Sequence, residues 1–243
     1  MTVIRLNRLT ASLRDLAAEK LLEEKWLVAP NLRTGYQWLD TVARSGQPIV
    51  NARVMTLQHM ALEVASPEME RLGVTFLRGY RAEVIIDRVF TALRREGRGY
   101  LSALEGGPGL IERLLQTTRD LRLARVDPGR LDPEHFEVAD KGSEIAVLLG
   151  LYEEELRNGK LVDYADIIRM AMKRLREDGP GLQEDVILIA PADMLERLEG
   201  LERLLWEAVP EARRTLLEVD RPGEERKDGL CDSALLSWVR DPT

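Results

Sequence analysis

The chain has 243 residues, of which 44% are hydrophobic and 32% charged, a balance that excludes a disordered protein. Its formal net charge of −7 excludes indiscriminate nucleic-acid binding, although local arginine clusters could still supply a positive footprint. The single cysteine, Cys231, excludes a disulfide framework and a cysteine-ligated metal site, and no apolar run approaches the roughly 18 residues of a membrane span, so we expect a cytoplasmic protein without a membrane partner.

The first part of the chain alternates short apolar runs with helical patterns. The runs expected to form strands are 3–6, 26–30 and 52–56, and the expected helices cover 11–22, 34–46 and 57–65. The first helix places Leu13, Leu16, Ala17 and Leu21 on one face, and the second turns Leu39, Val42 and Ala43 inward. Strands separated by helices predict right-handed crossovers and a parallel sheet.

The middle of the chain, from about Gly79 to Asp178, has helical periodicity almost throughout. Four apolar stripes are expected to pack on one another: 82, 85, 86, 89, 90 and 93; 110, 111, 114, 115 and 121; 145, 148, 149, 152 and 156; and 164, 167, 168, 171 and 175. The α/β pattern then returns, with expected strands at 185–190 and 214–219 and a helix at 195–209. The predicted fold is α/β, a parallel sheet with helices on both faces, interrupted by a mostly helical insertion.

This pattern divides the chain into three parts: 1–78 begins the α/β domain, 79–180 is the helical insertion, and 181–243 returns to the α/β domain. The last part is polar after Arg221 and only weakly helical at its end. A sheet that stops there is unfinished, so we expect the chain to be the N-terminal fragment of a longer polypeptide.

Three stretches together resemble the first motor domain of the UvrD/AddB-type superfamily 1 helicases and their inactivated or nuclease-fused relatives, such as AddB- and RecC-type subunits. They are WLVAPNLRTGYQWL (26–39), NARVMTLQHMALEVA (51–65) and LYEEELRNGKLVDYADIIRMA (151–171). They resemble the second strand and its loop, the strand and helix beside single-stranded DNA, and the helix pair that returns from the insertion. The resemblance implies a P-loop-NTPase-like sheet and covers nearly the whole chain.

The residues that would hold ATP depart from the family pattern. A phosphate-binding loop has the sequence GxxxxGK(S/T), because glycines let backbone N–H groups turn inward and the lysine meets the phosphates. The matching stretch here is RLNRLTAS (5–12), where only Arg8, Thr10 and Ser12 could contribute a charge or a hydroxyl. After the strand 185–190, Asp193 stands without the adjacent glutamate of the second motif. We expect no cofactor, with ATP and Mg²⁺ bound only if this degenerate loop still holds them.

Two segments are candidates for contact with single-stranded DNA. Asn31, Arg33 and Thr34 follow the second strand, where the resemblance implies contact with the DNA backbone; they could equally form an ordinary surface loop. Thr56 and His59 open the next helix, whose free N–H groups favour phosphate. Thr56 could instead serve only as a helix cap, and His59 could be a surface or packing residue.

The insertion contributes a row of arginines, Arg113, Arg119, Arg122 and Arg125, of which Arg119 and Arg122 are the DNA-binding candidates. A solvated face with salt bridges to Glu112 and Asp120 is the alternative, and Arg78, Arg81 and Arg88 are similar in kind. Asp163 and Asp166 flank Tyr164; a capping role for this pair is preferred over metal or acid–base chemistry. His135 and Cys231 have no partners at the spacing of a catalytic triad or a metal site.

These features predict a degenerate helicase-like domain of a DNA repair or recombination nuclease-helicase. It would contribute a DNA channel or scaffold without hydrolysing ATP, so that the sheet is kept for its shape. Its partners would be single-stranded DNA, the rest of a longer polypeptide and a helicase-nuclease subunit. One alternative is a protein-interaction module that docks a partner motor subunit. A second is an ATPase with an atypical phosphate loop.

Overall fold

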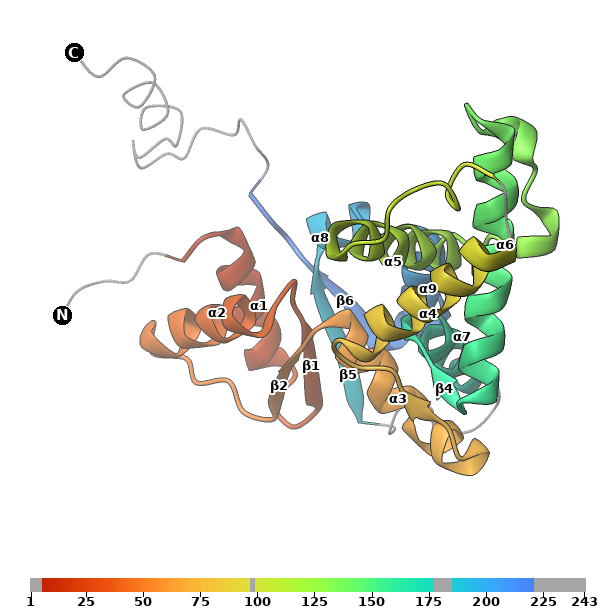
Figure 1. The fold of residues 1–243 in the computed structure, drawn as a ribbon. Helices are drawn as coiled ribbons and strands as arrows, with labels where there is room; N and C mark the ends of the chain where they lie inside the picture. Colours follow the sequence, from red (N-terminus) through yellow and green to blue (C-terminus); the bar gives the residue numbers. More distant parts are fainter. Residues whose placement is uncertain (1–5, 97–98, 177–184, 221–243) are drawn as a thin grey trace, which may run out of the picture.

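The computed structural model describes residues 6–96, 99–176 and 185–220 (Figure 1). Four parallel strands form the main sheet in the order β2–β1–β5–β6. Their bounds are Glu24–Val28 (β1), Ala52–Met55 (β2), Val186–Pro191 (β5) and Arg214–Leu217 (β6). Leu27 of β1 lies opposite Ile189 of β5, although the whole middle of the chain separates these strands in sequence. The predicted parallel sheet with an inserted helical segment is therefore confirmed.

Helices cover both faces of this sheet (Figure 1). On one face lie α1 (Arg8–Glu19) and α2 (Leu32–Arg44), and on the other α3 (Leu57–Leu72), α7 (Tyr164–Arg176) and α9 (Gly200–Ala208). Successive strand residues point to opposite faces, so Trp26 and Val28 pack toward α3 and α7 while Leu27 packs toward α1 and α2. We call the four strands and these five helices the sheet body.

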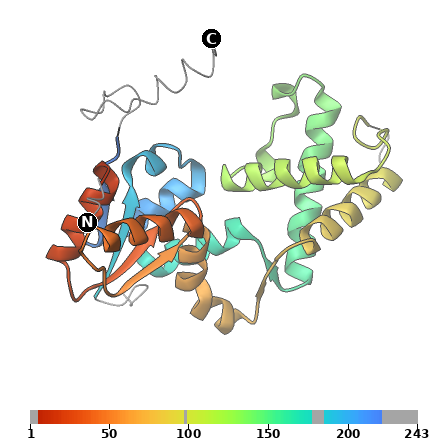
Figure 2. The same cartoon turned by 90° about the vertical axis from the view of Figure 1, so that its left-hand side faces the viewer.

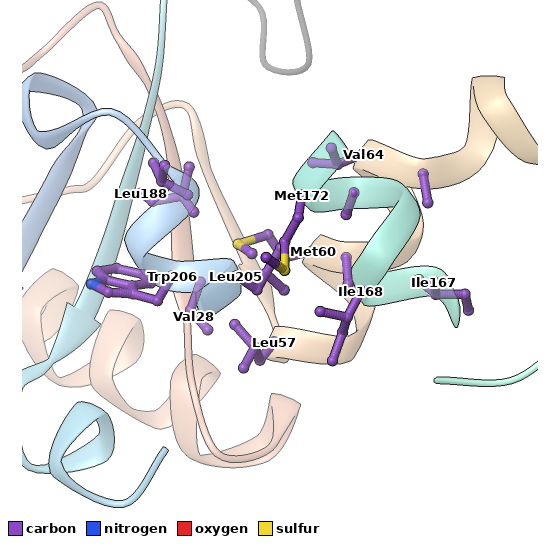
Figure 3. Close-up of a cluster of buried hydrophobic side chains, with 14 of the residues drawn as sticks. Val28, Leu57, Met60, Val64, Ile167, Ile168, Met172, Leu188, Leu205 and Trp206 are labelled. Atoms are coloured by element: carbon purple, nitrogen blue, oxygen red, sulfur yellow. The ribbon is translucent and has the colours of Figure 1, made fainter. Parts of the chain in front are cut away.

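The larger core of the sheet body lies between the sheet and α3, α7 and α9 (Figure 3). Met60 of α3, Ile168 of α7 and Leu205 of α9 are fully buried there. The residues of the fourth apolar stripe contribute to this core, because α7 packs against α3 and α9 rather than among the helices of the insertion. The helix pair α6 (Ala139–Asn158) and α7 thus connects the insertion directly to the sheet.

Three further long helices, with two short helices beside them, form a second core, which stands to one side of the sheet (Figure 2). They are α4 (Arg81–Glu96), α5 (Pro108–Leu123) and α6 (Ala139–Asn158), with the short helices η1 (Pro128–Arg130) and η2 (Pro133–His135), and we call them the helical region. The first three predicted stripes meet in this core, where Ile86, Phe90 and Tyr152 are almost completely buried. The chain leaves and re-enters the sheet body through two short parallel strands, β3 (Thr75–Phe76) and β4 (Leu161–Val162).

Several boundaries differ from the sequence prediction. The strand β1 begins at Glu24, earlier than predicted, and includes Lys25, whose side chain is 1% exposed. The Lys25 ammonium donates to the carbonyl oxygen of Glu23 at 2.7 Å, and burial lowers its pKa. The predicted helix 195–209 is two helices, α8 (Ala192–Glu196) and α9, because Gly200 interrupts it with φ = 51°.

Other expected features fall outside these elements or beyond the described residues. The helix α1 ends at Glu19, so Leu21 is 49% exposed rather than buried, and Ala43 is also exposed. The last short helix, η3 (Glu211–Arg213), precedes β6. The predicted strand 3–6, apart from Leu6, lies outside the described residues, as do Cys231 and the weakly helical end of the chain.

Candidate nucleic-acid interface

The stretch compared with a phosphate loop is helical from Arg8 onward, which corrects the expected loop. Asn7 is the N-cap of α1, and its side-chain oxygen accepts the backbone N–H of Thr10 at 2.9 Å and the Thr10 hydroxyl at 2.7 Å. Asparagine is among the strongest N-caps, so the helix begins within the stretch, and the cap satisfies one of its free N–H groups. Thr10 is buried, Ser12 lies within the second turn, and Arg8 lies 3.8 Å from Asp220.

The second degenerate motif lies at the end of β5. Asp193 falls in the first turn of α8, and its carboxylate accepts a hydrogen bond from Arg197 at 3.2 Å, one helical turn later. The Arg197 side chain is 80% exposed and that of Asp193 43%. Asp193 therefore takes part in an ordinary surface ion pair on a short helix.

Two capped helices begin at the carboxyl edge of the sheet, just beyond β1 and β2. The Asn31 side chain accepts the N–H of Thr34 at 2.9 Å at the start of α2, and the Thr56 hydroxyl accepts the N–H of His59 at 3.2 Å at the start of α3. The capping role considered for Thr56 is confirmed. Because β1 and β2 are neighbours, with Val28 opposite Met55, both helix starts lie at one edge of the sheet.

A hollow of about 370 Å³ lies between α2 and α3 beside β2, and it brings an aromatic side chain to the candidate residues. Tyr36 and His59 both line it, and Tyr36 is 58% exposed. Arg33 lies one helical turn before Tyr36 and so shares its side of α2. Among the described residues, no ion pair or hydrogen bond engages the Arg33 side chain. The sequence analysis missed Tyr36, although an aromatic residue three positions after Arg33 was visible in the quoted motif.

A second cavity, of about 330 Å³, joins the sheet body to the helical region. Gln58 from the first turn of α3 lines it together with Gln116 and Arg119 of α5. Tyr164 of α7 forms another wall and donates its hydroxyl to Glu202 at 2.9 Å; burial and this carboxylate raise the pKa of Tyr164. The structure thus brings Arg119 of α5 and Gln58 at the start of α3 to the same cavity.

Arg122 occupies a very different environment, and its assignment to a DNA-contacting face is corrected. Only 3% of its side chain is exposed. The guanidinium donates to Asp163 and to Asp166, both at 2.6 Å, and to Glu153. This guanidinium is paired with three carboxylates and is almost completely buried, so it is not an exposed contact for DNA. We call these four side chains the Arg122 cluster.

The Arg122 cluster also explains the paired aspartates of the third family-like stretch. The Asp163 side chain accepts the N–H of Asp166 at 3.1 Å, and the N–H of Asp163 donates to the Asp166 carboxylate at 3.4 Å, which is a reciprocal cap at the start of α7. The preferred capping interpretation is therefore confirmed. The sequence analysis missed the buried arginine, because Arg122 and these carboxylates are about 40 residues apart, beyond the reach of local periodicity.

Burial sets the protonation behaviour of this cluster. Burial raises the pKa of Asp166, as does the Asp163 carboxylate, against the opposing effect of Arg122. Burial alone would lower the pKa of Arg122, but the carboxylates of Asp163 and Asp166 outweigh it and raise the pKa. Burial also raises the pKa of Tyr152, whose ring lies 5.8 Å from the Arg122 guanidinium. The Arg122 guanidinium is thus paired on several sides within the interior, an arrangement typical of a structural joint.

The remaining candidates are dispersed over the surface. Arg113 is exposed on α5 and Arg125 follows the end of that helix. Arg88 pairs with Glu155 at 2.8 Å, and Arg78 stacks on Phe76. His135 is exposed and lies 4.0 Å from Asp132, away from the candidate interface. The predicted stripe of arginines is therefore not one continuous surface.

Searches for other chemistry and for relatives give the following results. Within the described ranges, no group of three or more His, Cys, Asp or Glu side chains is placed to hold a metal ion. In the same part of the chain, no helix has both the length and the apolar character to cross a membrane.

Comparison with known protein families finds no match, and comparison with curated proteins finds no relative.

Proposed function

We propose that this chain is a helicase-like scaffold that holds single-stranded DNA without hydrolysing ATP, in cytoplasmic DNA repair or recombination. The observation that carries the proposal is the arrangement along the carboxyl edge of the sheet. The starts of α2 and α3 lie along this edge, with Arg33 and the exposed Tyr36 on α2, and Arg119 of α5 lines a cavity with Gln58 at the start of α3. Among the described residues, neither arginine has an ion-pair partner. Ligands of parallel α/β sheets bind preferentially at this edge.

Each part of this edge suits one part of a nucleic-acid strand. Arg33 and Arg119 are available to phosphates, since no described residue forms an ion pair with either side chain. The exposed ring of Tyr36 offers a surface on which a base can stack, and His59 lines the same hollow. Gln58 and Gln116 add neutral donors and acceptors in the cavity beside Arg119. A strand laid across the starts of α2 and α3 would meet these groups in turn.

The helical start of α1 supports a role without ATP hydrolysis. A phosphate loop needs glycines that let its backbone wrap the phosphates and a lysine that meets them, whereas the stretch 5–12 has neither and is helical from Arg8 onward. Thr10, one of its two hydroxyl residues, donates to the Asn7 side chain and is buried. The DNA-holding role therefore depends on the carboxyl edge rather than on this corner.

Binding of a fluorescein-labelled oligo-dT to the whole chain tests the proposal. We expect saturable binding that weakens steeply with salt. Replacing Arg33 and Arg119 together (R33Q/R119Q) should reduce the slope of log affinity against log salt concentration by roughly 0.7 for each phosphate that the variant no longer neutralises. Tyr36→Ala should weaken binding with little change in slope, because stacking is not ionic. Arg113→Gln, which removes an exposed arginine of α5 outside both cavities, is the control. Salt-independent binding, or equal losses in the control, would contradict this assignment.

Binding of ATP, which hydrolysis requires, needs a separate measurement. A ligand that binds only the folded state raises the thermal unfolding midpoint. Since we expect no binding, magnesium-ATP should leave the midpoint unchanged. A magnesium-dependent rise would support the ATPase alternative and leave the DNA result standing on its own.

A further inference from the structure

A third cavity, of about 640 Å³, lies where the ends of α5 and α6 meet α7 and β4. The Arg122 cluster lies between it and the second cavity, the one that Arg119 lines. Asp163 lines that second cavity, whereas Glu153 and Asp166 line this one. Leu156, Val162 and Met170 form an apolar floor. We call it the basic pocket, because of the side chains at its rim.

The rim of the basic pocket carries cations that no described carboxylate neutralises. Arg125, Arg157 and Lys160 are exposed there, and none of them forms an ion pair with a described residue. The three acidic residues of the lining are already engaged. Glu153 and Asp166 bind Arg122, and Asp127 caps Gly129 and pairs with Arg130. In a chain with a net charge of −7, this is a local positive surface around an apolar floor.

The backbone at two of these cations is unusual. Arg125 and Lys160 have φ values of 66° and 49°, a region in which glycine is the favoured residue. Each follows the end of a helix, at a position that glycine commonly occupies. The chain therefore has long cationic side chains at two places where the backbone favours glycine, and both side chains line the same pocket.

We propose that the basic pocket binds an acidic peptide segment of a partner protein, with one large apolar side chain of that segment on its floor. Separate carboxylates would meet Arg125, Arg157 and Lys160, and the apolar anchor would pack on Leu156, Val162 and Met170. None of the described residues that line the pocket is aromatic, so it offers no ring on which a base could stack. This observation favours a peptide over a nucleic-acid strand.

Fluorescence anisotropy with a defined probe tests the proposal on the whole chain. The probe is a fluorescein-labelled peptide in which a leucine–tryptophan pair is flanked on both sides by glutamates. We expect saturable, salt-sensitive binding, and we expect weaker binding by a peptide with serines in place of the apolar pair or with glutamines in place of the glutamates. Failure of the wild-type chain to bind the acidic apolar probe, or equal binding of all three peptides, overturns the proposal.

The positive φ values provide variants that remove charge without harming the fold. Arg125→Gly combined with Lys160→Gly should weaken probe binding by about tenfold or more, since two charge-assisted hydrogen bonds to the probe can no longer form. The thermal unfolding midpoint should stay the same or rise, because glycine suits both backbone positions. Arg125→Lys with Lys160→Arg should keep the affinity near that of the wild type. Arg95→Gln with Arg113→Gln, which removes two exposed arginines away from the pocket, should leave it unchanged.

The same variants separate this proposal from the DNA-binding role. The glycine variant should bind oligo-dT as the wild type does, and R33Q/R119Q should bind the peptide as the wild type does. Loss of oligonucleotide binding in the glycine variant, or displacement of the peptide by oligo-dT, would assign the basic pocket to nucleic acid and overturn the peptide proposal. Absence of oligo-dT binding, with peptide binding intact, would remove only the proposed DNA role.

Discussion

The sheet body and the helical region bury their apolar residues in different ways. In the sheet body, alternate residues of one strand serve two cores, as Trp26 and Leu27 do on opposite faces of β1. In the helical region, three amphipathic helices share one core, and each exposes its other face. The helical region can be inserted between β2 and β5 in the chain because β5 pairs directly with β1, so the sheet forms without it.

The joint between the two regions is polar, whereas their interiors are apolar. Arg122 comes from α5 of the helical region, and Asp163 and Asp166 come from the start of α7 in the sheet body. Hydrogen bonds are directional, so such a joint fixes an orientation that apolar contact alone leaves adjustable. The Arg122 cluster therefore adds an orientation-setting contact to the apolar contact of Leu123 with the sheet-body core and to the pairing of β3 with β4.

Replacing Arg122 by methionine should have the largest effect on this arrangement. Arg122→Met leaves three carboxylates in or near the interior without their common partner. We expect a loss of about 3–5 kcal/mol in the free energy of unfolding, measured by urea denaturation. Arg119→Met, one turn earlier on the same helix, should change it by less than about 1 kcal/mol, since it breaks no ion pair between described residues. Similar losses in both variants would show that the cluster is not the joint.

A pair of core substitutions should show whether the two regions unfold separately. Leu148→Ala removes a buried side chain from the helical region, and Leu205→Ala removes one from the sheet body. Each should cost about 2–5 kcal/mol through lost burial and the cavity left behind. Hydrogen exchange should rise in α4–α6 for the first variant and in α3, α7 and α9 for the second. Faster exchange throughout the described elements in both variants would mean that the chain is one cooperative unit.

Repeated local patterns explain what could be predicted from the sequence. The spacing of Ile86 and Phe90 predicted a buried helical face, and the apolar run 185–190 predicted a central strand, because each rests on many residues with one period. The apolar run alone predicts a strand from Trp26 and so misses Lys25, whose buried ammonium is satisfied by the backbone carbonyl oxygens of Leu21, Glu23 and Val50. Arg119 and Arg122 are one helical turn apart on the same predicted helix. Only the carboxylates that bind Arg122, which lie far from it in the sequence, distinguish the two arginines.

A close backbone approach between the two regions should produce an intermediate effect. A Cβ atom on Gly200, at the start of α9, would lie 2.2 Å from the carbonyl oxygen of Leu123 at the end of α5, and Gly200 has φ = 51°. Gly200→Ala should therefore cost at least about 1–2 kcal/mol from the backbone alone, measured by urea denaturation. Gly150→Ala in α6 is the matched control, because a Cβ there meets nothing within 4 Å. It should stabilise the chain by about 0.5–1 kcal/mol, and a stabilising Gly200→Ala would show that the regions do not approach so closely.

The smallest expected effect concerns an ion pair inside the sheet body, away from the joint. Glu68 of α3 accepts hydrogen bonds from Arg71 and lies 3.7 Å from Lys173 of α7. The pKa of Glu68 is lowered from 4.5 to about 2, and the hydrogen bonds from Arg71 are the largest cause. A lowered carboxyl pKa contributes stability above pH 4.5 that is lost as the pH falls toward 2. Glu68→Gln should therefore be slightly less stable than the wild type at neutral pH, and the difference should shrink on acidification through this window. Urea denaturation at several pH values measures the difference.

Glu70→Gln, on the same helix and without an ion pair among the described residues, controls for the loss of one negative charge. A difference for Glu68→Gln that widens in acid would contradict the assignment and place the main acid-sensitive contact elsewhere, with the Arg122 cluster as the next region to test.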